Sequence, residues 1–162
     1  MVKVCFLLLA RLFLKLTFSV NATVYSLNQE GSRVQISLME PGSNDTLCTH
    51  YGTADTALTF TIDSPKLWSP DSPTLYNMEI RMGDDMVQSY TGFRTVSRGE
   101  IDGIERPLLN GEFVFQFGTL DQGYWPDGLY TPPSREAMVY DLQTLKRLGF
   151  NMVRKHVSSV LS

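Results

Sequence analysis

The sequence predicts a mixed β and α/β fold, in which an antiparallel β-sandwich precedes a single β-α-β unit. Residues 16–98 alternate apolar and polar side chains with a period of two, between regularly spaced turn-forming segments. Residues 113–117 form an apolar run without alternation, and residues 135–148 carry helical spacing. The chain has 162 residues, which suffices for one domain, or for one small domain and part of another.

The composition excludes several classes of protein. Hydrophobic residues make up 43% of the chain, so we expect a packed core rather than disorder. The net charge is -3, and no block of lysine and arginine offers the basic surface that a nucleic-acid partner requires. No uncharged apolar run reaches the ~18 residues of a membrane span, so we expect no transmembrane segment.

The N-terminus has two interpretations. Lys3, the apolar run of residues 4–10 and the small residues at 20–22 resemble a secretory signal peptide, although two basic residues interrupt the apolar stretch. The alternative is a strand from about Leu16, because apolar residues then alternate up to Val24. We favour the strand, leave residues 1–15 unassigned, and note that the sequence permits secretion without requiring it.

Secretion would make two further features relevant. Asn21 and Asn44 each begin an Asn-X-Thr triplet and are candidate glycosylation sites. Cys5 and Cys48 could pair in an oxidising compartment, and two free buried thiols are the alternative. These cysteines and the two histidines lack the spacing of a zinc site, so we expect neither a metal nor a cofactor.

Three segments of the sandwich show the alternation clearly. They are "RVQISLM" at 33–39, "TALTFTI" at 56–62 and "TLYNMEIRM" at 74–82. The sequence "MGDDM" is compact enough to close a hairpin between residues 74–82 and 86–96. Residues 99–106 are polar and glycine-containing, so we expect them to be a domain linker.

The last third predicts the β-α-β unit. Asn110-Gly111 is a tight-turn dipeptide, and Phe113–Phe117 has the composition of a strand buried on both faces. Ser134 is a good N-cap for a helix that Gly149 would end. The apolar stripe of that helix comprises Met138, Leu142, Leu145 and Leu148. A second strand follows in "FNMVRKHV".

The loop between that strand and the helix has an unusual composition. Tyr124, Trp125 and Tyr130 lie among Gly, Pro and two aspartates, Asp121 and Asp127. Aromatic rings pack on the apolar faces of sugars and carboxylates accept hydrogen bonds from hydroxyls, so this composition suits a sugar pocket. The alternative is that the rings only pack the loop onto the sandwich. Asp127 precedes Gly128, which favours a turn role for it.

Four segments in order resemble glycoside hydrolase family 2, the family of β-galactosidases, β-glucuronidases and β-mannosidases. These segments are "LWSPDSPTLY", "GFRTV", "LLNGEFVFQFGT" and "LKRLGFNMVR". The matching residues are Leu67, Trp68, Pro70, Pro73, Leu75, Tyr76, Gly92, Phe93, Arg94, Asn110, Gly111, Gly118, Leu148, Gly149, Asn151 and Arg154.

The resemblance implies a domain order. Residues 16–98 would be the immunoglobulin-like sandwich, residues 99–106 a linker, and residues 107–162 the incomplete start of the (β/α)8 barrel. The family hydrolyses O-glycosidic bonds with retention, using two glutamates on later barrel strands. The chain ends before those strands, so we expect no catalytic residue in it and no activity from this fragment without the remainder of its barrel.

The resemblance also implies substrate-binding residues. Asp121 falls where the family often has an asparagine that faces the sugar, and Trp125 lies in the aromatic loop. Arg154 matches the family's arginine at the end of the second barrel strand, with a structural ion pair as its alternative role. His156 departs from the common Arg-x-x-His pattern by one residue, so its assignment as a sugar ligand is the weakest.

Two functions thus compete, with a third less favoured. The first is a glycoside hydrolase acting on a carbohydrate substrate. The second is a non-catalytic sandwich that binds carbohydrate or protein. The third is an adhesion-type immunoglobulin-like module, which the "LKRLGFNMVR" segment argues against, because a pure sandwich has no use for a β-α-β unit.

Overall fold

The computed structural model describes residues 3–12, 16–26 and 31–156, and for residues 3–12 and 16 it describes the backbone alone. The chain divides into two compact units, Met1–Glu112 and Phe113–Ser162.

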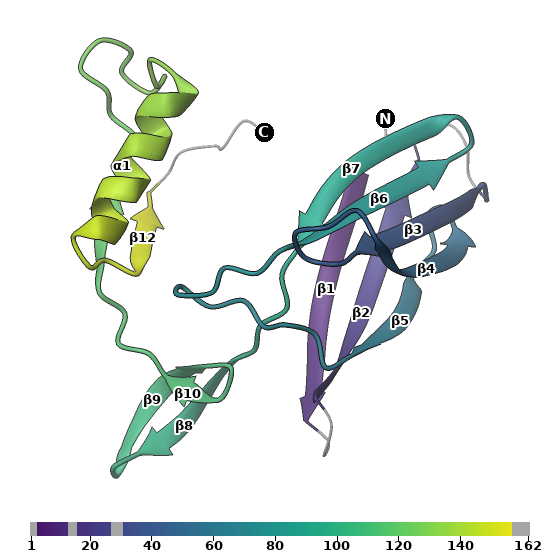
Figure 1. Ribbon diagram of the computed structural model, residues 1–162, viewed down its shortest axis with the longest axis horizontal. Coiled ribbons are helices and arrows are strands. Elements are labelled where there is room, and N and C mark those ends of the chain that lie inside the picture. Colours follow the sequence, from purple (N-terminus) through teal and green to yellow (C-terminus); the bar gives the residue numbers. More distant parts are fainter. Residues whose placement is uncertain (1–2, 13–15, 27–30, 157–162) are drawn as a thin grey trace. The chain divides into compact units, whose positions relative to one another are not determined.

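The first unit contains two antiparallel sheets that face each other as a β-sandwich (Figure 1). One sheet has the order β1-β2-β5, with strands Lys3–Leu12, Leu16–Tyr25 and Leu58–Asp63. The other has the order β4-β3-β6-β7, with strands Thr46–Thr53, Arg33–Met39, Tyr76–Met82 and Asp85–Thr91. The predicted antiparallel sandwich is confirmed.

The core lies between these sheets and follows the predicted alternation. The inward side chains of β2, β3, β5 and β6 are buried, while their sequence neighbours face outward. The buried hydrophobic residues are Phe18, Val20, Ala22, Val24, Val34, Ile36, Leu38, Ala54, Phe60, Ile62, Tyr76, Met78, Ile80, Met82 and Phe93.

Three aromatic rings close one end of this core. The ring of Phe93 lies 5.5 Å from that of Phe18 and 5.0 Å from that of Tyr76, both edge-on, which is a favourable aromatic geometry. The Tyr76 hydroxyl accepts a hydrogen bond of 2.7 Å from the Lys66 backbone N–H. Burial raises the pKa of this phenol, so it stays protonated over the physiological range.

The predicted hairpin at "MGDDM" is also confirmed. Met82 pairs with Asp85, which leaves Gly83 and Asp84 as a two-residue turn. Gly83 has φ 58 at the first central position, a conformation that glycine adopts at little cost.

Residues 99–106, which the sequence marks as a domain linker, contain regular strands. They belong to a hairpin of β8 (Val96–Ile101) and β9 (Ile104–Leu109), to which β10 (Glu112–Phe113) adds a third strand. Asp102-Gly103 closes the hairpin with φ of 53 and 75. An Asp-Gly pair is a strong hairpin signal, and the polar flanks obscured it. Asn110-Gly111, with φ of 54 and 83, forms the predicted tight turn.

The N-terminal residues favour the strand alternative. Lys3–Leu12 forms β1, which pairs antiparallel with β2 along its whole length. Cleavage at the signal-like residues 20–22 would divide β2, which supplies Phe18, Val20, Ala22 and Val24 to the core. The side chain of Cys5 lies outside the described part of the structure.

The second unit has the predicted β-α-β connectivity. β11 (Gly118–Asp121) and β12 (Met152–Lys155) pair in parallel, and α1 (Arg135–Arg147) connects them (Figure 1). The Ser134 hydroxyl accepts from the Ala137 N–H as the predicted N-cap, and Gly149 follows the helix with φ 91.

The prediction for Phe113–Phe117 was wrong. Only Phe113 belongs to a strand in this run, and the parallel strand begins at Gly118. The Asn151 side chain replaces a neighbouring strand: it accepts from the Phe117 N–H and donates to the Phe115 carbonyl, at 2.9 and 2.8 Å. Phe115 is 70% exposed, so the run is not buried on both faces.

The apolar stripe of the helix is largely uncovered. No residue of α1 is buried, and Met138, Leu142 and the following Leu148 are exposed. Within the residues that the structure describes, no helix is long and apolar enough to cross a membrane.

The Tyr76 hydrogen bond supports a stability prediction. Tyr76→Phe leaves the Lys66 N–H without its acceptor, so the free energy of unfolding should fall by about 1–3 kcal/mol. Urea denaturation followed by circular dichroism measures this. Tyr90→Phe is the matched control, because Tyr90 is 66% exposed on the next strand. Equal stability of the two variants would contradict a structural role for the Tyr76 hydroxyl.

His50 links the edges of the two sheets. Its ring stacks on Phe60 of β5 with a centroid distance of 4.0 Å, and its Nε2 is buried without a hydrogen-bond partner in the described structure. Burial lowers the pKa of His50, because the folded protein disfavours the imidazolium form.

This burial predicts a pH dependence. The unfolded chain binds a proton at His50 more readily than the folded chain does. The contribution of neutral His50 to the free energy of unfolding is therefore complete above about pH 6.5 and decreases as the pH falls below that value. His50→Phe preserves the stacking and removes the titration. Unfolding curves between about pH 7.5 and 5 should show a smaller loss for the variant than for the wild type, and equal slopes would contradict the assignment.

Candidate functional site

The first candidate site is the edge of the second unit where both parallel strands end. Asp121 is the last residue of β11 and pairs in register with Lys155, the last residue of β12. The ladder continues one step further, because the His156 N–H donates to the Asp121 carbonyl at 2.9 Å. The structure therefore places Asp121 and His156 side by side at the carboxyl ends of the two strands.

An ion pair organises this edge. The Lys155 Nζ lies 2.7 Å from Asp121 Oδ2, and the Gly123 N–H donates to Asp121 Oδ1 at 2.7 Å. The Lys155 ammonium, as hydrogen-bond donor, lowers the pKa of Asp121, and the Gly123 N–H lowers it further. The carboxylate is therefore ionised at neutral pH and also holds the first turn of the loop.

Arg154 lies on the other face of the strand pair. It is in register with Leu120, and successive residues of a strand point to opposite faces, so Arg154 and the Asp121–Lys155 pair diverge. Arg154 is exposed and makes no ion pair within the described residues. The structural ion pair considered for Arg154 belongs instead to Lys155.

Lys155 is the functional candidate that the sequence reasoning missed. It lies between Arg154, which matches the family pattern, and His156, which nearly matches it, but has no counterpart in that pattern itself. The alternation of side chains along the strand could have identified it. In the parallel pair, the residue opposite Asp121 and on the same face is Lys155, whereas Arg154 is opposite Leu120.

The loop after β11 folds back on itself. The Trp125 N–H donates to the Leu129 carbonyl at 2.7 Å, which closes a tight turn over Pro126, Asp127 and Gly128. Asp127 therefore lies in a turn, as predicted. The Tyr124 and Tyr130 hydroxyls hydrogen-bond at 2.7 Å, and both rings are exposed. Trp125 is half-buried.

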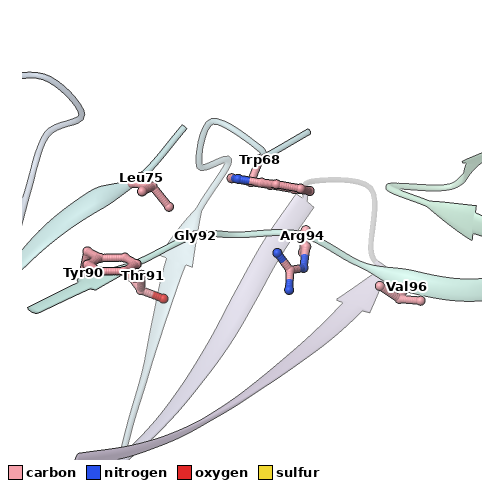
Figure 2. A pocket seen from close by; sticks show the side chains of 7 residues that line it. All are labelled: Trp68, Leu75, Tyr90, Thr91, Gly92, Arg94 and Val96. Atoms are coloured by element: carbon pink, nitrogen blue, oxygen red, sulfur yellow. The ribbon is translucent and has the colours of Figure 1, made fainter. Parts of the chain in front are cut away.

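The second candidate site is a hollow of about 510 Å³ on the first unit (Figure 2). It is lined by Trp68, Leu75, Tyr90, Thr91, Gly92, Arg94 and Val96. Figure 2 shows the Trp68 indole facing the Arg94 guanidinium, whose central carbon lies 4.9 Å from the ring centroid. Sequence reasoning used Trp68 and Arg94 only as family markers and did not identify this hollow.

Backbone contacts fix the walls of the hollow. Leu67 and Phe93 form an isolated parallel bridge, and the Trp68 N–H donates to the Phe93 carbonyl at 2.8 Å. The Asn110 side chain donates to the Trp68 carbonyl and accepts from the Thr95 N–H, both at 3.0 Å. The segments that carry Trp68 and Arg94 are thus bound to each other and to the β9–β10 turn.

The remaining predicted sites differ in their surroundings. Asn44 is exposed in the turn between β3 and β4, as an accessible glycan acceptor must be. Asn21 is half-buried within β2, which has a partner strand on each side, so its geometry is less favourable. Cys48 is a half-buried free thiol whose pKa is raised by burial. No group of metal-binding side chains occurs among the described residues.

An antiparallel sandwich followed by a β-α-β unit with polar strand ends defines a modular protein with an all-β part and an α/β part. The family comparison makes this class specific. Residues 14–94 match the model of glycosyl hydrolases family 2, and the chain belongs to that family. The match includes the "LWSPDSPTLY" segment and ends at Arg94.

A named relative and several solved structures are consistent with this family assignment. A Formosa agariphila protein named "Putative beta-glucuronidase" is 35% identical over 100 residues, which cover 57% of this chain and 9% of that protein. A Bacteroides vulgatus β-glycosidase superposes with a TM-score of 0.74 and 22% identity, over 95% of this chain and 20% of the other. Parabacteroides merdae β-glucuronidase superposes with a TM-score of 0.70 and 18% identity, over 95% of this chain and 21% of the other. These structural likenesses show the fold, and the chain spans about a fifth of these solved chains.

Gly118 supplies a test of the strand pairing at the first site. A Cβ at Gly118 would lie 2.6 Å from the Met152 carbonyl oxygen, so Gly118→Ala should force β11 and β12 apart. Hydrogen exchange at the Asn151 and His156 amides, which donate across this pair, should accelerate at least about tenfold. Thr119→Ala is the control on the same strand, and equal exchange rates in both variants would contradict the tight pairing.

Proposed function

We propose that this chain is part of a glycoside hydrolase that cleaves O-glycosyl bonds, and that the strand-end edge of its second unit contacts the sugar. Membership of glycosyl hydrolases family 2 supports the reaction class. The observation that carries the site is the parallel pairing of β11 and β12, which brings Asp121, Lys155 and the Trp125 loop to the carboxyl ends of the strands. Ligands of α/β folds bind at such ends.

We assign the sandwich, residues 16–98, to the immunoglobulin-like type. The support is the Tyr76 hydrogen bond and the arrangement of seven strands in sheets of three and four, to which β1 contributes from before residue 16. A tyrosine at the start of the sixth strand whose hydroxyl binds the backbone upstream, here ten residues away at Lys66, is similar to the tyrosine corner of immunoglobulin-like domains. The sheet of β8, β9 and β10 overlaps the proposed linker and extends the first unit beyond residue 98.

We assign residues 107–162 to the opening of a (β/α)8 barrel. A (β/α)8 barrel begins with a strand, a helix and a parallel strand, which is the order of β11, α1 and β12. The exposed apolar residues of α1 are what a helix shows before neighbouring barrel elements cover it. The remainder of the barrel is the partner that this unit requires.

The roles at the strand ends follow from their charges. Asp121 is ionised and can accept from sugar hydroxyls, while Lys155 donates beside it. Trp125 offers an aromatic face and His156 an exposed imidazole. Arg154 projects from the opposite face, so it would reach the same sugar only past the end of β12.

A non-catalytic binding module is the second candidate, and the hollow on the sandwich favours it. Its volume and its aromatic lining are within the range of small-ligand sites. The two functions are compatible, because the hollow lies entirely within the first unit.

Enzyme assays test the first proposal. On p-nitrophenyl β-glycosides, the 162-residue chain should show no turnover, because the two glutamates of the mechanism are expected on later barrel strands. A transcript that continues this reading frame should encode those strands, and its product should hydrolyse at least one glycoside of the panel. In that product Asp121→Ala should reduce kcat/KM about a hundredfold.

The matched control is Asp127→Ala, which alters a carboxylate in the turn of the same loop. An active longer product whose kcat/KM is unaffected by Asp121→Ala would exclude the assigned contact. A transcript without such strands would favour the non-catalytic function.

A further inference from the structure

We propose that the hollow formed by Trp68, Tyr90 and Arg94 is a binding site for an acidic saccharide, separate from the strand-end site. It is a property of the sandwich alone and does not depend on the proposed glycosidase activity. Its volume of about 510 Å³ accommodates one or two pyranose rings, within the range of small-ligand pockets.

The aromatic lining explains why a sugar would bind. Trp68 is half-buried, so its ring is fixed, and Tyr90 presents a ring that is 66% exposed. Flat rings of this kind bury apolar surface with little loss of side-chain entropy. Gly92 lies between them (Figure 2), and a Cβ there would lie 3.3 Å from the Leu75 side chain, so glycine keeps the hollow open.

Polar groups complete the site. The Trp68 indole N–H has no hydrogen-bond partner among the described residues and can donate to a sugar hydroxyl. The Thr91 hydroxyl also lines the hollow (Figure 2). A binding site needs only a few such groups beside its apolar walls, because they set the orientation of the ligand.

Arg94 explains why the sugar would be acidic. Its guanidinium rests on the Trp68 ring and makes no ion pair with any described carboxylate. Its in-plane N–H groups therefore remain available to a carboxylate, which matches them with two parallel hydrogen bonds. None of the lining residues is acidic, so the local charge is positive although the chain carries -3 overall.

The site is also held in shape before a ligand arrives. The Leu67–Phe93 bridge and the Asn110 hydrogen bonds fix the backbone on both sides of the stacked pair. A backbone that is already fixed on both sides lowers the entropy cost of binding, because the ligand does not have to order these two segments.

Two ligands that differ only in the carboxylate test the proposal. Methyl β-D-glucuronide and methyl β-D-glucoside are titrated into the 162-residue chain, and the indole N–H signals are followed by NMR. The chain has two tryptophans, so Trp125→Phe assigns the remaining signal to Trp68. The glucuronide should shift the Trp68 signal with an affinity at least about tenfold above that of the glucoside.

The variants separate the charge from the rings. Arg94→Gln should weaken glucuronide binding about tenfold and leave glucoside binding unchanged, whereas Tyr90→Ala should weaken both. Arg33→Gln is the matched control, because Arg33 also stacks on a ring, that of Tyr51 at 4.3 Å, outside the hollow.

Three results would overturn the proposal. They are equal affinity for the two sugars, an unchanged affinity in Arg94→Gln, and no shift of the Trp68 signal at any concentration tested. The last result is expected if the hollow instead receives a protein surface. A shift confined to Trp125 would report on the loop of the second unit and would leave the strand-end proposal standing while this one failed.

Discussion

The isolated bridge between Leu67 and Phe93 links the core of the first unit to the hollow on its surface. It joins the segment before β6 to the segment after β7. Phe93 enters the core against Phe18 and Tyr76, while its neighbours Gly92 and Arg94 face outward beside Trp68. One pair of backbone segments thereby completes the core on one side and forms the walls of the hollow on the other.

Two asparagines perform the same task in the two units. Asn110 and Asn151 each use a backbone N–H and both ends of the side-chain amide to hold a neighbouring segment, through Thr95 and Trp68 in one case and Phe115 and Phe117 in the other. A side-chain amide can satisfy backbone groups where no partner strand is available, which removes the cost of leaving them unpaired. Both asparagines belong to the segments by which the sequence resembles its family.

The sequence predicted those parts of the fold that depend on local pattern. Alternation identified β2, β3, β5 and β6, and capping residues identified α1, because burial and helix ends follow from neighbouring residues. The local pattern could not predict which segments pair across long distances in the sequence. Phe113–Phe117 has the composition of a buried strand, but Asn151, 34 residues after Phe117, occupies its backbone groups. The hollow and the position of Lys155 beside Asp121 were not predicted for the same reason. Each depends on the register between segments that are far apart in the sequence.

The two candidate sites differ in whether their charged side chains are paired. This difference determines which chemical groups of a ligand each site can distinguish. At the strand ends, Lys155 neutralises Asp121, so the pair offers donors and acceptors to hydroxyls with little net charge. In the hollow, the Arg94 cation is stacked on a ring and faces no described carboxylate. A neutralised pair recognises the arrangement of hydroxyls, whereas an uncompensated guanidinium recognises an anion. A chain bearing both could therefore hold an acidic saccharide through the hollow independently of the sugar at the strand ends, because neither set of contacts uses a group of the other.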